Sequence, residues 1–519
     1  MEIVTKQIEI NQTTRKLANQ FVLDEDYNVP DSKPDIQKIV LSEGTARIDE
    51  IKVVENYLRV QGCVEFHILY AAEGFEPTYG CLEGNLPFVE MVYADGGNEG
   101  KLDIKGVRVE LNAYAIHSRK VRMKAMVELE LEEEKQYIEE IPVDVESQCK
   151  IFKKQAPVEL LHLLISKKDM YRIKEEITLP GTKETIGKVL WSDVANRKFE
   201  TRLGVDELQI TGELLVFCFY ESPEGKIDWI EQGVPYQGRV RCTDVQGAMY
   251  HHVQAELDSV HVEARTDEDG ETRIIGVEGS LRLCIAVYEE ETMEILEDFY
   301  SLEKNCIQET KEIVYEQLVL KNHSKCKLME RLSVPELGQG VLQICHSSGK
   351  LQVERMETRT DGVLVEGVMH VSFLYVKAND QMPFDTWQGV VPFSHLMECG
   401  EMEGASQQHI SSVLEQLSIT LQGGDEVEVK AILSFQGFFK RLEKRFMIQC
   451  VVEEPIALEE VEKRPSIVGY IVKQGDDLWS LAKRYCTSVE AICEVNETTE
   501  EKLQVGDRLL IFKENMGIL

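Results

Sequence analysis

The most regular feature of the chain is a segment of alternating apolar and polar residues that occurs three times. This alternation has the period of two that is typical of a β-strand with one buried face. In each segment a glycine stands eight residues before a tyrosine, and a glycine inside a strand commonly marks a bulge or a close backbone approach. The apolar faces are Leu58, Val60, Gly62, Val64, Phe66, Ile68 and Tyr70; Leu208, Ile210, Gly212, Leu214, Val216, Cys218 and Tyr220; and Val363, Val365, Gly367, Met369, Val371, Phe373 and Tyr375.

Three further landmarks recur in the same order around these segments. A proline precedes each glycine by thirty-two residues, a proline–aromatic pair follows each tyrosine, and another alternating segment comes later. Four landmarks that recur three times in one order indicate a repeat with a period of about 150 residues. The landmarks are Pro30, Pro180 and Pro335; Pro87-Phe88, Pro235-Tyr236 and Pro392-Phe393; and residues 121–131, 275–287 and 427–435.

The length of the repeat decides how each copy folds. A unit of this size is long enough to be a domain with its own core and is not a layer of a solenoid. The sequence therefore predicts a mainly β protein with three tandem antiparallel, sandwich-like or barrel-like domains at 1–150, 151–305 and 306–455. Short helical patches are expected at Val158–Ser166 and Ser411–Leu417.

The last part of the chain has a different pattern. A charged, proline-bounded linker, Glu453–Pro465, precedes a predicted domain at 466–514. Here Asp476 or Asp477 can cap a first helix, Thr487 or Ser488 can cap a second, and Asn496 closes the second helix. The apolar stripe Leu478, Leu481, Ala482 and Tyr485 has helical spacing, and short strands lie at 470–472 and 509–512. The predicted order is βααβ.

This C-terminal segment resembles the LysM domain. The matching positions are Tyr470, Val472, Gly475, Asp476, Leu478, Trp479, Ala482, Asn496, Leu503, Gly506, Leu509 and Ile511. The resemblance implies a shallow groove for N-acetylglucosamine-containing glycans between the loops 475–478 and 495–499. The candidate partner- or glycan-binding residues are Gly475, Asp476, Asp477, Leu478, Trp479, Val495, Asn496, Glu497 and Thr498.

Two departures from the LysM pattern bear on the ligand. Asp477 stands where the family usually has threonine, and Glu497 where proline is common. These carboxylates weigh against a sugar and leave protein binding open. Trp479 lies off the apolar stripe of its helix, so it is either an exposed binding anchor or a residue packed on the linker or the last strand. Asn496 is expected to end the helix more than to contact a ligand.

Composition narrows the classes of function. With 57 basic and 92 acidic residues among 519, the net charge is −35, which disfavours nucleic acid and anionic membrane surfaces as partners. There is no apolar run of membrane-spanning length, no leader-like N-terminus, and no CxxC pair among the 13 cysteines. We find no catalytic motif, metal-ligand spacing or cofactor loop; the His251-His252 pair has no second ligand pair at a recognisable spacing. A non-enzymatic cytoplasmic protein is expected.

The tract Val29–Ile36, the three repeats and the LysM-like segment together resemble the SipL-like family of SPOCS-plus-LysM proteins of endospore-forming anaerobes. The resemblance implies a scaffold for spore-coat morphogenesis in the mother-cell cytosol, at the forespore surface. It also implies that the LysM domain binds a coat-scaffold ATPase of the SpoIVA type. Two alternatives stay open: a peptidoglycan-binding protein, and a hydrolase with a LysM targeting domain.

Overall fold

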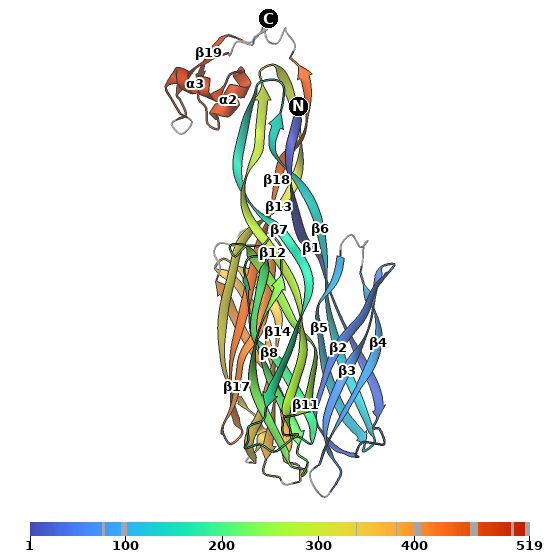
Figure 1. Ribbon diagram of the computed structural model, residues 1–519. Helices are drawn as coiled ribbons and strands as arrows, with labels where there is room; N and C mark the ends of the chain where they lie inside the picture. The colour runs from blue at the N-terminus through green and yellow to red at the C-terminus, as the bar shows by residue number, and fades with distance from the viewer. Residues whose placement is uncertain are drawn as a thin grey trace.

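The computed structural model describes residues 1–74, 78–94, 101–338, 340–379, 381–398, 406–456, 465–499 and 503–513. Most of the predicted linker therefore lies outside the described residues, as do residues 500–502 and 514 of the predicted C-terminal domain. Strands dominate the described residues, and the two α-helices found among them lie near the C-terminus (Figure 1). The predicted mainly β class is confirmed.

Eighteen strands form three units of the same topology. Each unit has two three-stranded antiparallel sheets: its first, sixth and fifth strands form one sheet, and its second, third and fourth form the other. The prediction of three tandem antiparallel units is thus confirmed, whereas the boundaries 1–150, 151–305 and 306–455 stay a prediction.

The bounds of the strands follow the chain in order. The first unit contains β1 (Glu2–Asn28), β2 (Ile36–Val54), β3 (Tyr57–Ala72), β4 (Tyr79–Tyr93), β5 (Lys101–His117) and β6 (Lys120–Glu146). The second contains β7 (Ile151–Thr178), β8 (Lys188–Leu203), β9 (Glu207–Glu221), β10 (Ile227–Arg241), β11 (Tyr250–Thr266) and β12 (Thr272–Ser301). The third contains β13 (Lys304–Ser333), the 3₁₀ turn η1 (Pro335–Leu337), β14 (Val341–Arg359), β15 (Gly362–Lys377), β16 (Phe384–Glu398), β17 (Ser406–Gly423) and β18 (Glu426–Pro455).

The glycine of each repeat faces the aromatic residue of the proline–aromatic pair on the neighbouring strand. Gly62 pairs with Phe88, Gly212 with Tyr236 and Gly367 with Phe393. A Cβ at Gly62 would overlap the carbonyl oxygen of Arg47 and lie 3.0 Å from Phe88 Cζ. The second strand of each unit also has an irregular register beside the glycine. The predicted bulge and close approach are both present.

The two sheets of each unit enclose an apolar core of their own. The core of the first unit includes Val64, Phe66 and Val127, and those of the other two are built from equivalent positions. Alternation along the strands explains this arrangement, since one side of each sheet is apolar.

A further core joins the three units to one another. It includes Leu69 and Tyr79 from the first unit, Trp191 and Phe219 from the second, and Phe384 from the third. The contacts close into a ring. The imidazole of His67 stacks on Trp191 with ring centroids 4.3 Å apart, Phe217 stacks on His346 at 4.1 Å, and Lys38 Nζ of the first unit lies 2.7 Å from Asp385 of the third.

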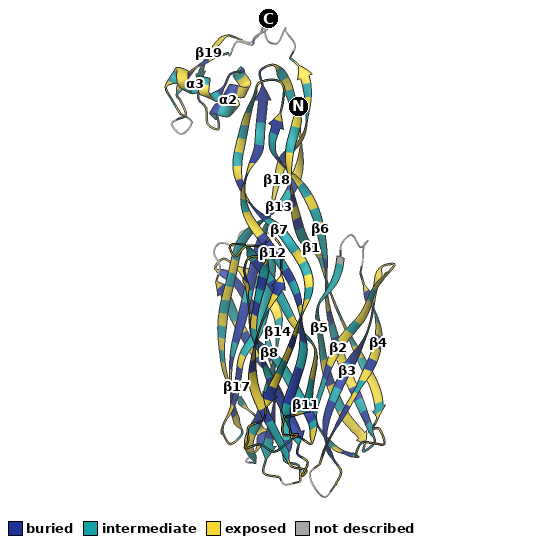
Figure 2. Ribbon diagram, in the orientation of Figure 1, coloured by how far each residue is buried: buried dark blue, intermediate teal, exposed yellow. Residues whose placement is uncertain are grey.

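The first and last strands of each unit run on beyond the sandwiches and form a common stalk (Figure 1). Buried and exposed residues alternate along these strands (Figure 2). The stalk core contains Ile8, Ile10 and Ile141; Val158, Leu160, Met293 and Ile295; and Ile313, Tyr315 and Met447, from the first, second and third units respectively.

The shared stalk also buries an ion pair. Lys440 Nζ and Glu316 Oε1 lie 2.8 Å apart with both side chains almost fully buried, and Lys440 donates to the carbonyl of Asn11 and the hydroxyl of Tyr288. One ammonium group thus joins groups from all three units. Each copy therefore has the core of its own that the sequence predicts, and a further part of the core is shared by all three units.

The predicted helical patches are wrong. Residues 158–166 lie in β7 and residues 411–417 in β17. The register shifts where Ile165 and Leu163 pair with consecutive residues of β12, and again between Leu414 and Gln416. A bulge moves the following side chains to the other face, so the apolar spacing imitates that of a helix.

Candidate binding site

The C-terminal module has the predicted βααβ order. It consists of β19 (Ile467–Ile471), α2 (Leu478–Tyr485), α3 (Val489–Asn496) and β20 (Arg508–Phe512), with β19 and β20 paired antiparallel. Its core holds the predicted helical stripe together with residues of both strands. The buried members are Val472, Leu478, Leu481, Ala482, Cys486, Ile492, Leu509 and Ile511.

The first candidate loop uses its carboxylates to hold its own shape. Asp476 Oδ2 accepts hydrogen bonds from the backbone N–H of Lys473 and the hydroxyl of Tyr470, both at 2.8 Å. Asp477 caps α2 by accepting from the backbone N–H of Ser480, as predicted. Gly475 has a φ of +87°, which favours glycine. Leu478 is fully buried, so it supports the loop and is not available to a ligand.

Asn496 has a structural role in the second candidate loop. Its amide nitrogen donates to the carbonyls of Ile492 and Leu510, and its amide oxygen accepts from the backbone N–H of Leu510. These three bonds tie the end of α3 to β20. Val495 and Glu497 on either side are exposed, and Glu497 adopts a left-handed backbone conformation. Thr498 in the same loop is half-buried.

Trp479 contacts the tip of the stalk. Its Nε1 donates to Asp298 Oδ2 at 2.8 Å, and its ring meets that of Tyr300 edge-on with centroids 5.0 Å apart. Both partners belong to β12 of the second unit. Trp479 thus leaves the apolar stripe of α2, as the helical wheel predicts. Trp479 is half-buried against β12. It is therefore neither fully exposed to solvent nor packed on the linker or the last strand.

Other groups complete this docking contact. Lys483 Nζ lies 2.7 Å from Asp298 Oδ1, and the Tyr300 hydroxyl donates to the carbonyl of Thr487 at 2.8 Å. The ring of Phe152 stacks on that of Tyr300 with centroids 5.0 Å apart. Burial alone would raise the pKa of Asp298, but hydrogen bonds from Lys483, Trp479 and Gln308 hold it below its usual value. The sequence analysis did not identify Asp298, Tyr300 and Phe152 as part of a contact. The only indication of it was that aromatic and acidic residues stand at the ends of these strands.

The outer side of the β19–β20 ribbon carries apolar side chains. Along both strands alternate residues point to the module's core, and the others point away from it. The outward residues Ile467, Ile471, Leu510 and Phe512 are 56%, 59%, 42% and 40% exposed. We call these four residues the outer ribbon face. Because Ile467 pairs with Phe512, and Gly469 with Leu510, they form one continuous surface.

The His251-His252 pair belongs to the packed part of the molecule. His251 Nε2 lies 3.1 Å from the hydroxyl of Thr201, and His252 packs near His409 and Phe438. Burial lowers the pKa of both imidazoles to about 4, so they are neutral at ordinary pH. Packing accounts for this pair without a ligand.

Comparison with known proteins identifies two kinds of domain. The LysM domain family matches residues 470–512, and the SipL SPOCS domain family matches residues 35–117 and 340–422. These matches confirm the resemblance drawn from the sequence. The SPOCS match does not extend to the second unit, although that unit has the same strand order. Both domain families are non-catalytic. Neither a search of curated proteins nor one of solved structures returns a match. In the described part of the chain, no helix is long and apolar enough to span a membrane.

Proposed function

Because the chain carries two SipL-type SPOCS domains and a C-terminal LysM domain, we propose that it is a non-enzymatic scaffold of endospore coat assembly. Its LysM module is the part that binds a partner, a coat-scaffold ATPase of the SpoIVA type. The protein acts in the mother-cell cytosol at the forespore surface. No step of this function requires a cofactor.

The observation that supports a protein partner is the outer ribbon face. Four exposed aliphatic and aromatic side chains lie side by side on a module of only some fifty residues. Such a surface gains free energy mainly by excluding water from another apolar surface, which a protein can supply. A glycan offers mostly hydroxyl groups, and it would need polar side chains that are free to bond. In the candidate loops, Asp476, Asp477 and Asn496 already have partners within the module.

The alternative is peptidoglycan binding, which the LysM match itself favours. In the loop from Val495 to Thr498, both Val495 and Glu497 are exposed. A sugar chain would therefore have access to one side of the LysM groove. The two candidate functions predict that substitutions at different residues will weaken binding.

Direct binding of the full chain to the purified coat ATPase and to insoluble peptidoglycan tests both candidates. Leu510→Glu places a charge in the outer ribbon face and should weaken binding to the ATPase by at least about tenfold, since buried anchors commonly contribute 2 kcal/mol or more. Retention on peptidoglycan should be absent in both the original and the variant chains.

A matched control is Val205→Glu, which places the same charge at a more exposed aliphatic residue of the second unit. It should leave both measurements unchanged. Peptidoglycan retention that is lost on Glu497→Lys but kept in Leu510→Glu would instead establish the glycan-binding alternative. ATPase binding that Leu510→Glu leaves at full strength would remove the outer ribbon face from the interface.

A further inference from the structure

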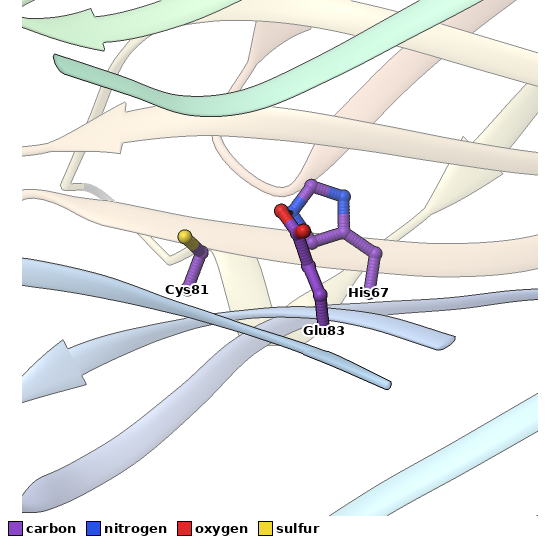
Figure 3. Close-up of side chains that lie close together, drawn as sticks. All are labelled: His67, Cys81 and Glu83. Carbon is purple, nitrogen blue, oxygen red and sulfur yellow. Dashed lines mark ion pairs between the residues drawn. The ribbon is translucent and has the colours of Figure 1, made fainter. Parts of the chain in front are cut away.

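Three side chains of the first unit bring together nitrogen, sulfur and oxygen donors. His67 on β3 lies directly opposite Glu83 on β4, and Cys81 is two residues before Glu83 on the same face (Figure 3). One ligand atom from each residue lies within 4.8 Å of those of the other two. His67 Nε2 and Glu83 Oε1 are 3.3 Å apart. Sequence spacing did not reveal this cluster because the strand pairing brings His67 to the other two.

The donor atoms suit a transition metal. Zinc takes imidazole nitrogen, thiolate sulfur and carboxylate oxygen at bond lengths of about 2.0–2.3 Å, which places tetrahedral ligand atoms roughly 3.5 Å apart. The His67–Glu83 separation already meets that value. Cys81 and Glu83 can close the remaining distance by side-chain rotation. Three protein ligands leave a fourth position for water.

The surroundings of His67 prepare it as a ligand. Its ring is stacked on Trp191 of the second unit with an interplanar angle of 17°, so its orientation is held. Its Nε2 is buried and forms no hydrogen bond among the described residues, although the Glu83 carboxylate lies 3.3 Å away. A buried polar atom of this kind is unfavourable unless it binds something.

The other two ligands supply charge and access. Cys81 is buried, and the ammonium of Lys33 lies 3.9 Å from its sulfur. Glu83 is exposed, so an ion can reach the cluster from solvent. In the second and third units the equivalent positions hold Phe217, Trp229 and Glu231, and Ser372, Thr386 and Gln388. The complete set of ligands therefore occurs in the first unit alone among these three equivalent sites.

The geometry points to a binding site for one divalent transition-metal ion, best suited to Zn²⁺, formed by His67, Cys81 and Glu83 at the junction of the first two units. A bound ion would join β3 to β4 and hold His67 against Trp191. It would therefore stabilise the contact between these two units.

Titration of the metal-free full chain with Co²⁺, followed by Zn²⁺, tests the site. We expect one Co²⁺ per chain, with a thiolate-to-cobalt charge-transfer band that Zn²⁺ removes. Cys81→Ser should abolish this band, and His67→Gln and Glu83→Gln should each weaken binding by at least about tenfold. Because Trp191 touches His67, bound Co²⁺ should also quench part of the tryptophan fluorescence in the original chain.

The matched control is Cys450→Ser, since Cys450 is an exposed thiol 2.9 Å from Glu309 and is the natural place for adventitious binding. This change should leave the titration unaltered. Circular dichroism of each metal-free variant checks its fold, and Glu83→Gln is the mildest of the three changes because Glu83 is exposed. A charge-transfer band that survives Cys81→Ser, or that disappears with Cys450→Ser, would overturn the assignment.

Discussion

His346 lies at the contact between the second and third units, where it has two acidic neighbours. Its Nδ1 lies 2.5 Å from Glu231 Oε2 and its Nε2 lies 2.9 Å from Asp193 Oδ2. Phe217 covers one face of the ring. Burial alone would lower the pKa of His346, but the hydrogen bonds and charges of Asp193 and Glu231 raise it to about 9. When both ring nitrogens of His346 are protonated, Nδ1 can donate to Glu231 and Nε2 can donate to Asp193.

The stability of this contact should depend on pH. Because the pKa in the folded chain lies above the ordinary value of 6.5, protonated His346 stabilises the fold fully below pH 6.5, and this contribution is lost as pH rises through about 9. The expected loss in the free energy of unfolding is roughly 3 kcal/mol. Urea denaturation followed at pH values below 6.5 and above 9 measures it.

The control for this pH dependence is His346→Gln, which keeps a hydrogen-bond donor but cannot become charged. The variant should be less stable than the original chain at low pH, and the difference between the two should shrink as pH rises. A difference that stays constant over this range would show that His346 does not change its charge there.

At the scale of elements, the glycine–aromatic pairs explain why the repeat keeps its landmarks. A β-strand that carries glycine loses side-chain packing at that point, and the aromatic ring opposite covers the gap. Phe88, Tyr236 and Phe393 do so in the three units. The aromatic ring occupies the space that a side chain at the glycine position would take. The glycine and the proline–aromatic pair are therefore parts of one structural feature.

Gly62→Ala should therefore destabilise the first unit. The added methyl group would overlap the carbonyl oxygen of Arg47 and press on Phe88, which commonly costs about 1–3 kcal/mol. Thermal unfolding measures the change. Gly181→Ala is the control, since no atom lies within 4 Å of the added methyl group and the backbone there suits alanine. Equal midpoints for the two variants would contradict the close approach at Gly62.

At the scale of the whole molecule, the stalk both joins the three units and positions the LysM module at its tip (Figure 1). Asp298 is the centre of that contact, since it accepts hydrogen bonds from Trp479, Lys483 and Gln308. The docked module leaves the outer ribbon face exposed. The stalk thus holds the proposed partner-binding surface away from the sandwich units.

Asp298→Ala should release the module from the stalk. The change leaves the Trp479 N–H and the Lys483 ammonium without their acceptor, a loss of about 1–3 kcal/mol. Hydrogen exchange of the backbone around Asp298 and small-angle scattering of the full chain should report faster exchange and larger dimensions. The control is Glu294→Ala, which removes an exposed carboxylate from the same strand and should have no effect. Unchanged scattering in Asp298→Ala would show that other contacts suffice for docking.

The local features of the protein follow from patterns in its amino-acid sequence. Period-two alternation predicted the central strands, and the recurring landmarks predicted three copies of one unit, because strand burial and turn chemistry act over short distances. The caps at Asp477 and Ser488 and the closing role of Asn496 could also be predicted, since each involves a hydrogen bond to a nearby backbone group or the end of a helix.

Features that depend on residues far apart in the chain became visible only in the three-dimensional structure. The bulges in β7 and β17 broke the alternation, and only their pairing partners show those residues to be strands. The shared stalk core, the docking of Trp479 on Asp298, and the meeting of His67 with Cys81 all arise where separate elements come together. A pattern along one strand cannot report such contacts, because it records which face is buried but not what covers that face.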